Sequence, residues 1–133
     1  MVAKMLHRKT VVAVLDDESK MRSALARLLR THDYEVRLFE SGDDFLTAAQ
    51  VQAPDCLLLD LHMPGTTGFD VLGAMPALHI KVPAIVITGH DEPGNAARVR
   101  ELGAANYLLK PLDESALVGA IERACPHPPS TPN

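Results

Sequence analysis

The stretch Cys56-Leu57-Leu58-Leu59-Asp60 decides the fold, and Leu61-His62-Met63-Pro64-Gly65 follows it directly. Four apolar residues lead into one carboxylate, and a proline and a glycine soon interrupt regular structure. A short apolar run without alternation is typical of a strand buried on both faces of a parallel sheet. Open α/β sheets bind their ligands at the carboxyl ends of the strands. The stretch predicts that Asp60 stands at a ligand site as a nucleophile for a phosphoryl group, although an aspartate there is also typical of a simple turn.

Composition and charge describe a globular domain of ordinary size. The chain has 133 residues, of which 47% are hydrophobic and 23% charged, enough for one core. The net charge of -4 argues against nucleic-acid binding by this chain alone. No run approaches the roughly 18 apolar residues of a membrane span, and the N-terminus lacks a secretory signal. Cys56 and Cys125 are typical of free thiols in a reducing compartment, so we expect a cytoplasmic protein.

Hydrophobic periodicity predicts four more strands and five helices. The strands are expected at Thr10–Leu15, Tyr34–Phe39, Val82–Ile87 and Asn106–Leu109. The helices are expected at Ser19–Thr31, from an N-cap at Ser41 through Ala49, at Gly68–Ala77, from a first turn at Pro93 through Leu102, and from Asp113 or Ser115 to Ala124. Alternating strands and helices predict a parallel sheet with helices on both faces. The count favours the flavodoxin-like doubly wound α/β fold, a (βα)5 three-layer sandwich with strand order 2-1-3-4-5.

One domain accounts for nearly all of the chain. We expect it to cover residues 10–124, after an N-terminal segment at residues 1–9. Residues 125–133 hold four of the ten prolines of the chain, a composition typical of a linker or a loose tail.

Carboxylates converge where the order of the strands reverses. In the predicted order this point lies between the first strand, which ends at Asp16 and Asp17, and the third, which ends at Asp60. Neighbouring strands lie ~4.8 Å apart, so the three acids would be crowded and their pKa values raised. A hard divalent cation relieves such crowding, and Mg²⁺ accepts a few carboxylates while keeping open positions. The acids therefore predict a magnesium site.

Two further strand ends carry Thr88 and Lys110, which would lie on the other side of Asp60. A hydroxyl group and an ammonium group beside an acidic cluster suit a phosphoryl group, through a hydrogen bond and charge neutralisation. Each residue also has an ordinary interpretation, as a turn residue or a solvated lysine. Their coincidence at adjacent strand ends favours phosphoryl chemistry.

The motifs together resemble the receiver domain of bacterial two-component response regulators. They are Asp16-Asp17, Asp60 with Met63-Pro64 and Gly68, Thr88-Gly89, and Tyr107 through Lys110-Pro111. The segments DLHMPGTTGFDVL and IVITGH are most similar to receivers of nitrogen-fixation-type transcriptional regulators of the LuxR class. The resemblance covers residues 10–124.

The resemblance implies that Asp60 accepts a phosphoryl group from a phosphohistidine on a sensor histidine kinase or a histidine phosphotransfer protein. It implies that Mg²⁺, or Mn²⁺ in its place, is bound by Asp17, Asp60 and the backbone carbonyl of His62, with Asp16 acting through a water molecule. Lys110, before a cis bond to Pro111, would pair with the phosphoryl group.

The resemblance also implies a switch. Thr88 would move to the phosphoryl group and Tyr107 would turn inward behind it. This shift would remodel the face formed by the fourth helix, the fifth strand and the fifth helix, where a phosphorylation-dependent homodimer is expected. The domain would be a phosphoacceptor in a phosphorelay and not an enzyme, although it would assist its own phosphotransfer and dephosphorylation.

Histidines and arginines near these motifs have weaker interpretations. His62 and His90 lie two positions after Asp60 and Thr88, where receivers tune the lifetime of the phosphoryl group, although exposed loop histidines fit equally well. Arg22, Arg27 and Arg30 indicate a solvated helix face. In receivers the first helix also docks the phosphodonor.

Other functions remain as alternatives. A haloacid-dehalogenase-like phosphatase would also use Asp60 as its nucleophile, but it wants a second aspartate at the position of His62. A flavodoxin-like cofactor binder wants a hydroxyl- and glycine-rich phosphate loop where this chain has Asp16-Asp17-Glu18. As a receiver, the chain could stand alone or be the receiver half of a DNA-binding regulator.

Overall fold

Five short strands pair in parallel in the order β2-β1-β3-β4-β5, which confirms the predicted flavodoxin-like topology. The computed structural model describes residues 8–125, so most of the expected segments at 1–9 and 125–133 lies outside it. The strands are β1 (Val11–Leu15), β2 (Glu35–Phe39), β3 (Cys56–Asp60), β4 (Ala84–Thr88) and β5 (Asn106–Leu109). The helices are α2 (Ser19–Thr31), α3 (Gly42–Val51), α4 (Gly68–Ala77), α5 (Asn95–Glu101) and α6 (Glu114–Ala124).

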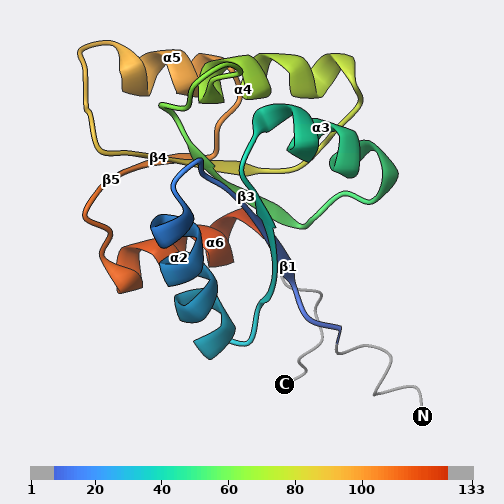
Figure 1. Cartoon of the computed structure of the whole chain (residues 1–133). Coiled ribbons are helices and arrows are strands. Elements are labelled where there is room, and N and C mark those ends of the chain that lie inside the picture. The colour runs from blue at the N-terminus through green and yellow to red at the C-terminus, as the bar shows by residue number, and fades with distance from the viewer. Residues whose placement is uncertain (1–7, 126–133) are drawn as a thin grey trace.

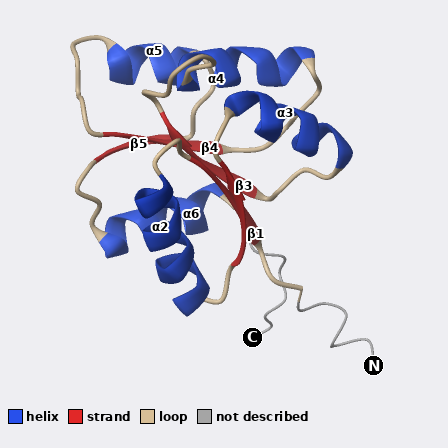
Figure 2. Ribbon diagram, in the orientation of Figure 1, coloured by secondary structure: helices blue, strands red, loops and turns tan. Residues whose placement is uncertain are grey.

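Two layers of helices enclose the sheet (Figure 1). Helices α2 and α6 cover one face, and α3, α4 and α5 cover the other (Figure 2). Strand β3 contributes to both cores: Leu57 and Leu59 pack in the cluster of Phe45, whereas Leu58 packs in the cluster of Leu29. Strands β1, β3 and β4 are buried throughout, because they lie inside the sheet and both of their faces are covered. The edge strand β2 is partly exposed, as its alternating sequence predicted.

The register aligns the polar residues that end the strands. Leu15 lies beside Leu59, Asp60 beside Ile87, and Thr88 beside Leu109. The side chains at or just after these positions therefore meet at one edge of the sheet. This is the carboxyl edge, where open α/β sheets place their ligands.

Two predicted boundaries were wrong by about two residues. Strand β4 begins at Ala84 and not at Val82, since Pro83 has no N–H to donate to a ladder. Helix α5 begins at Asn95, so Pro93 does not form its first turn. The intervening Gly94 has φ 88°, a left-handed conformation that a right-handed helix excludes.

Side-chain caps fix three helix starts. Ser41 Oγ accepts from the Asp44 N–H at 3.2 Å, as predicted for α3. Asp113 rather than Ser115 caps α6, since its carboxylate accepts from the Ala116 N–H at 2.8 Å. A complete capping box lies at the start of α4, where the Thr67 hydroxyl and the Asp70 carboxylate bind each other's backbone N–H.

The edge of the sheet opposite the strand ends is organised by Asp55. Its carboxylate accepts from the Val11 N–H at 2.8 Å and pairs with Arg8 at 2.9 Å, and the Arg8 hydrogen bond lowers the pKa of Asp55. Its carbonyl oxygen accepts from the Cys125 thiol at 3.4 Å. Both cysteines are free thiols, as expected, but Cys125 is buried in the same core cluster as Cys56 and does not begin a loose tail. Asp55 therefore binds residues near both ends of the described range, Arg8 and Cys125, at the edge of the sheet where the strands begin. We call this edge the Asp55 pole.

Candidate functional site

Three carboxylates meet at the carboxyl edge of the sheet. One oxygen atom from each of Asp16, Asp17 and Asp60 lies within 4.8 Å of the others. Asp16 and Asp60 are buried, whereas Asp17 is exposed at the mouth of the site. Oxygen ligands from a few carboxylates are the donors that Mg²⁺ accepts, and the exposed side leaves room for further oxygen ligands. The residues present therefore fit a hard divalent cation.

The surroundings of Asp60 make its negative charge unfavourable without such a cation. Burial and, after it, the neighbouring Asp16 raise the pKa of Asp60 from 3.8 to about 6. Lys110 and the His62 N–H, which donates to Asp60 Oδ1 at 3.4 Å, act in the opposite direction. A cation at the acidic cluster would remove most of this penalty.

Lys110 extends from the end of β5 into the carboxylate cluster. Its Nζ atom lies 3.4 Å from Asp16 Oδ2 and 3.9 Å from Asp60 Oδ1. The peptide bond from Lys110 to Pro111 is cis, as the resemblance implied. The ammonium group is thus placed to pair with an anion on Asp60.

Thr88 is fully buried at the end of β4 and is hydrogen-bonded within its own loop. Its hydroxyl donates to the His90 carbonyl at 3.2 Å and accepts from the His90 N–H at 3.1 Å. The structure places Thr88 in the strand beside Asp60, as the sequence predicted, but its hydroxyl proton is used inside the loop.

Tyr107 lies on β5, half-buried, with its hydroxyl at the surface. The hydroxyl donates to Asp91 Oδ1 at 2.9 Å. Burial and, after it, this hydrogen bond raise the pKa of Tyr107. The ring lines a hollow of about 190 Å³ between α5 and β5, together with Val99 and Arg100. The inward orientation implied by the resemblance stays a prediction.

His62 and His90 come from different loops but lie side by side. Their ring centroids are 5.5 Å apart with an interplanar angle of 83°, an edge-to-face arrangement. Both side chains are exposed, and their backbone N–H groups donate to Asp60 Oδ1 and to the Thr88 hydroxyl. Sequence reasoning placed each histidine near the site but did not predict this contact, which depends on how two loops pack.

Arg22 corrects the prediction of a uniformly solvated helix face. Its side chain is only 16% exposed, because its guanidinium donates to the Asp16 carbonyl at 2.7 Å and lies 3.6 Å from Glu40. Helical side chains lean toward the helix N-terminus, so an arginine in the first turn after the acidic loop reaches back to that loop. This geometry is the signal that would have identified Arg22.

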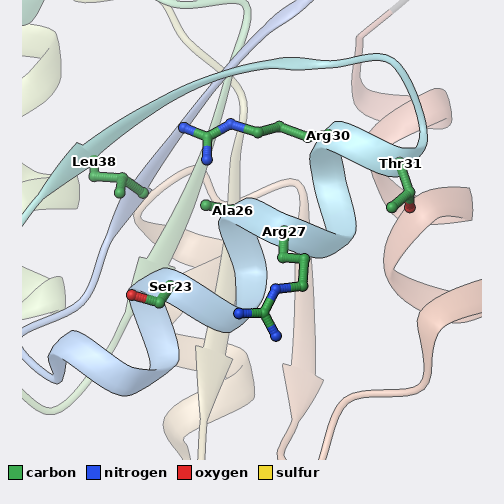
Figure 3. A pocket seen from close by; sticks show the side chains of 6 residues that line it. All are labelled: Ser23, Ala26, Arg27, Arg30, Thr31 and Leu38. Carbon is green, nitrogen blue, oxygen red and sulfur yellow. The ribbon is translucent and has the colours of Figure 1, made fainter.

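Arg27 and Arg30 are exposed, as the sequence predicted. They line a hollow of about 520 Å³ between α2 and β2, and Arg30 extends toward Leu38 on β2 (Figure 3). This hollow is separate from the carboxylates, since none of Asp16, Asp17 and Asp60 lines it.

The sequence did not reveal why residue 68, next to the site, is a glycine. A Cβ atom at this position would lie 2.7 Å from the Asp60 carbonyl oxygen and 2.8 Å from Leu61 Cα. The loop after β3 therefore closes onto the backbone of Asp60 only because residue 68 has no side chain.

Comparison with known proteins identifies the family. The sequence profile of the response regulator receiver domain matches residues 12–122. The chain is 34% identical over 116 residues to the transcriptional regulatory protein FixJ of Rhizobium meliloti, covering 87% of this chain and 57% of FixJ. It is 35% identical over 120 residues to the DNA-binding transcriptional regulator NtrC of Salmonella typhimurium, covering 90% of this chain and 26% of NtrC. The chain thus spans little more than half of one of these curated relatives and about a quarter of the other.

Solved structures agree with this result. The crystal structure of FixJ-N has a TM-score of 0.84 and 33% identity, covering 92% of this chain and 98% of that chain. The response regulator StyR has a TM-score of 0.81 and 34% identity, covering 89% of this chain and 60% of that one. These findings lend no support to the haloacid-dehalogenase alternative.

Within residues 8–125, no helix is long and apolar enough to cross a membrane. The family match over residues 12–122, the strand order and the acidic cluster all lead to one assignment. The chain belongs to the response regulator receiver domain family and is a receiver domain of two-component signal transduction.

Proposed function

We propose that Asp60 is the phosphoacceptor of this receiver and takes its phosphoryl group from a phosphohistidine on a sensor histidine kinase or a histidine phosphotransfer protein. The observation that carries the proposal is the setting of Asp60, at a strand end between two carboxylates and the Lys110 ammonium. A carboxylate oxygen of Asp60 attacks phosphorus, the P–N bond breaks, and the imidazole leaves. An acyl phosphate then replaces the carboxylate.

The acidic cluster would hold Mg²⁺, or Mn²⁺ in its place. Asp17, Asp60 and the backbone carbonyl of His62 would bind it directly, and Asp16 through a water molecule. The cation would neutralise charge on the transferring phosphoryl oxygens. The donor chemistry supports this role, since three carboxylates lie within reach of one ion.

Lys110 would stabilise the phosphoryl group after transfer. Its Nζ atom already lies 3.9 Å from Asp60 Oδ1, so a phosphoryl oxygen on Asp60 would come within the reach of its three N–H donors. Thr88 would supply a hydroxyl hydrogen bond, and Tyr107 would turn inward as Thr88 moves. His62 and His90 would influence how long the phosphoryl group persists. The domain would assist its own phosphotransfer and dephosphorylation while acting as a signalling element rather than as an enzyme.

The output would be carried by the face formed by α5, β5 and α6, through a phosphorylation-dependent homodimer. The printed names of FixJ and NtrC are those of transcriptional regulators, and both relatives are longer than the matched region. This supports a cytoplasmic receiver joined to a DNA-binding part, with a stand-alone receiver as the alternative.

Intact mass spectrometry after incubation with Mg²⁺ and a small phosphodonor tests the proposal. Acetyl phosphate and phosphoramidate should each add one phosphoryl group, and Asp60→Asn should remove the addition. Asp33→Asn is a matched control, because Asp33 is 83% exposed and pairs only with Lys9 in the described structure. Failure of the folded, Mg²⁺-loaded protein to accept a phosphoryl group from both donors would contradict the assignment of Asp60.

A further inference from the structure

One loop contacts both of the residues proposed to switch. Thr88 ends β4, and its hydroxyl is hydrogen-bonded to the backbone N–H and C=O of His90. The next residue, Asp91, accepts the hydroxyl hydrogen bond of Tyr107 at 2.9 Å. Thr88 and Tyr107 are therefore connected through two consecutive loop residues.

The contact between Asp91 and Tyr107 is a charge-assisted hydrogen bond. It joins a phenol donor to a carboxylate, and hydrogen bonds to an ionised acceptor are roughly twice as strong as neutral ones. Asp91 also raises the pKa of Tyr107, which indicates that the hydroxyl proton is retained. Since Tyr107 can donate only one proton, its side chain is held at the surface while Asp91 accepts it.

Asn95, in the first turn of α5, also acts on Tyr107. Its side chain is buried, and within residues 8–125 its Nδ2 atom has no hydrogen-bond partner. Asn95 acts on the pKa of Tyr107 in the opposite direction to Asp91. An unpaired buried donor is unfavourable. The Asn95 amide therefore does not hold Tyr107 through a short hydrogen bond, whereas Asp91 accepts from its hydroxyl at 2.9 Å and keeps it at the surface.

A change at Thr88 can break the hydrogen bond between Asp91 and Tyr107. Its hydroxyl has a single proton, which is donated to the His90 carbonyl in this structure. If that proton is donated to a phosphoryl oxygen on Asp60, the His90 carbonyl loses its partner. His90 and Asp91 are adjacent, so a change in the backbone at His90 displaces the Asp91 carboxylate.

We propose that Asp91 is a positioning residue that latches Tyr107 in the outward orientation, and that the movement of Thr88 toward a phosphoryl group releases the latch through His90. This inference rests on the proposed role of Asp60. The coupling runs from the Thr88 hydroxyl through the His90 backbone to the Asp91 carboxylate and the Tyr107 hydroxyl. The latch stabilises only the state with Tyr107 outward. Its removal therefore favours the state with Tyr107 inward and raises the affinity for a phosphoryl mimic.

The test measures binding of beryllofluoride, a phosphoryl mimic, in the presence of Mg²⁺. Asp91→Ala should bind it about three- to tenfold more tightly than the wild type, which is the effect of losing one hydrogen bond. Glu92→Ala is the matched control, since Glu92 is the adjacent exposed acid and its side chain makes no hydrogen bond to Tyr107. This control should stay within about twofold of the wild type. In a Tyr107→Phe background, Asp91→Ala should have no further effect.

A second readout follows Tyr107 itself. The chain has two tyrosines, so incorporation of 3-fluorotyrosine gives two ¹⁹F signals, and Tyr107→Phe assigns them. Asp91→Ala should shift the Tyr107 signal of the free protein toward its position in the beryllofluoride complex, whereas Glu92→Ala should not. An unmoved signal, or equal tightening in the Tyr107→Phe background, overturns the latch. Failure of the wild type to bind beryllofluoride overturns the role of Asp60. The latch is then tested by itself in the free protein, where Asp91→Ala should move the Tyr107 signal away from its wild-type position and Glu92→Ala should not.

Discussion

The Lys110 Nζ atom lies 3.9 Å from Asp60 Oδ1, although fifty residues separate the two in sequence. The same ammonium group lies 3.4 Å from Asp16 Oδ2, so it faces two carboxylates at once. Lys110 therefore lowers the pKa of Asp60 against the effect of burial, and it stands where a phosphoryl group on Asp60 would carry its charge.

Removal of this cation should impair phosphorylation. We expect Lys110→Met to slow phosphorylation of Asp60 by acetyl phosphate about a hundredfold, as is typical when one charge-stabilising donor is lost. The rate is measured by intact mass over time. Lys81→Met is the control, because Lys81 is exposed in the loop before β4, at the opposite edge of the sheet. Equal rates in the two variants would contradict the role given to Lys110.

Asp60 should make stability depend on pH in the absence of divalent cations. Its pKa is about 6 in the folded protein against 3.8 as the ordinary value, so the folded state binds the proton more tightly. The folded protein therefore loses stability as pH rises from about 4 to about 6, by up to about 3 kcal/mol. Urea unfolding of the wild type and of Asp60→Asn across this range isolates the effect. The stability advantage of Asp60→Asn should widen with pH, and a constant difference would show that Asp60 is not the group responsible.

Mg²⁺ should bind through the acidic cluster. We expect calorimetric titration to show that Asp17→Asn weakens Mg²⁺ binding about tenfold or more, since it removes one charged ligand. Asp33→Asn applies the same chemical change elsewhere, at a residue with φ 66° that asparagine also tolerates. The cation should raise the melting temperature of the wild type and of Asp33→Asn more than that of Asp17→Asn. Identical affinities would place the cation elsewhere.

Gly68 and Gly73 form a matched pair within α4. In Gly68→Ala, the new Cβ atom would collide with backbone atoms of Asp60 and Leu61, and helix α4 would have to move away from them. We therefore expect a loss of about 1–3 kcal/mol in unfolding free energy and slower phosphorylation. A Cβ atom at Gly73 meets nothing within 4 Å. Gly73→Ala should therefore stabilise the helix by about 0.5–1 kcal/mol and leave phosphorylation unchanged. Equal stability of the two variants, measured by chemical unfolding, would refute the close approach at Gly68.

His62 and His90 should affect the lifetime of the acyl phosphate. Their rings are in contact, and they follow Asp60 and Thr88 by two residues each, so they would limit the approach of water to a phosphoryl group on Asp60. We expect His62→Ala or His90→Ala to change the half-life of phospho-Asp60, which is measured by the decay of the phosphorylated mass. His79→Asn is the control, because His79 follows α4 with φ 60°, a conformation that asparagine adopts readily. Unchanged decay in both alanine variants would refute the role.

The sequence predicted the sheet well because its central strands are uninterrupted apolar runs. The bounds of β3 and β5 are those predicted, and the polar residues that end four strands met at one edge as expected. Such patterns are local, and the topology rules of parallel sheets convert them into spatial neighbours. The wrong start of α5 is also local in origin, since the left-handed conformation of Gly94 competes with the helix-starting preference of Pro93.

The contacts that the sequence did not predict are those between side chains of separate elements. Arg22, predicted to be solvated, donates to the Asp16 carbonyl, and the Tyr107 hydroxyl donates to Asp91 in the loop after β4. These partners depend on rotamers and loop packing, which hydrophobic periodicity does not record. The meeting of the candidate site residues at one edge could be predicted from their place at strand ends, whereas their hydrogen-bond partners required the folded structure.

The position of Asp55 has a consequence for how a signal could leave the domain. Asp55 fastens Arg8 and Cys125 at one pole of the sheet, and Asp60 ends the five-residue strand β3 at the other. Five residues of strand span about 16 Å, roughly twice the Debye length of about 8 Å at physiological salt. Salt in the solvent would thus screen the interaction between a new charge on Asp60 and polypeptide attached at the Asp55 pole. We therefore expect a signal to reach that pole mainly through a displacement of packed elements.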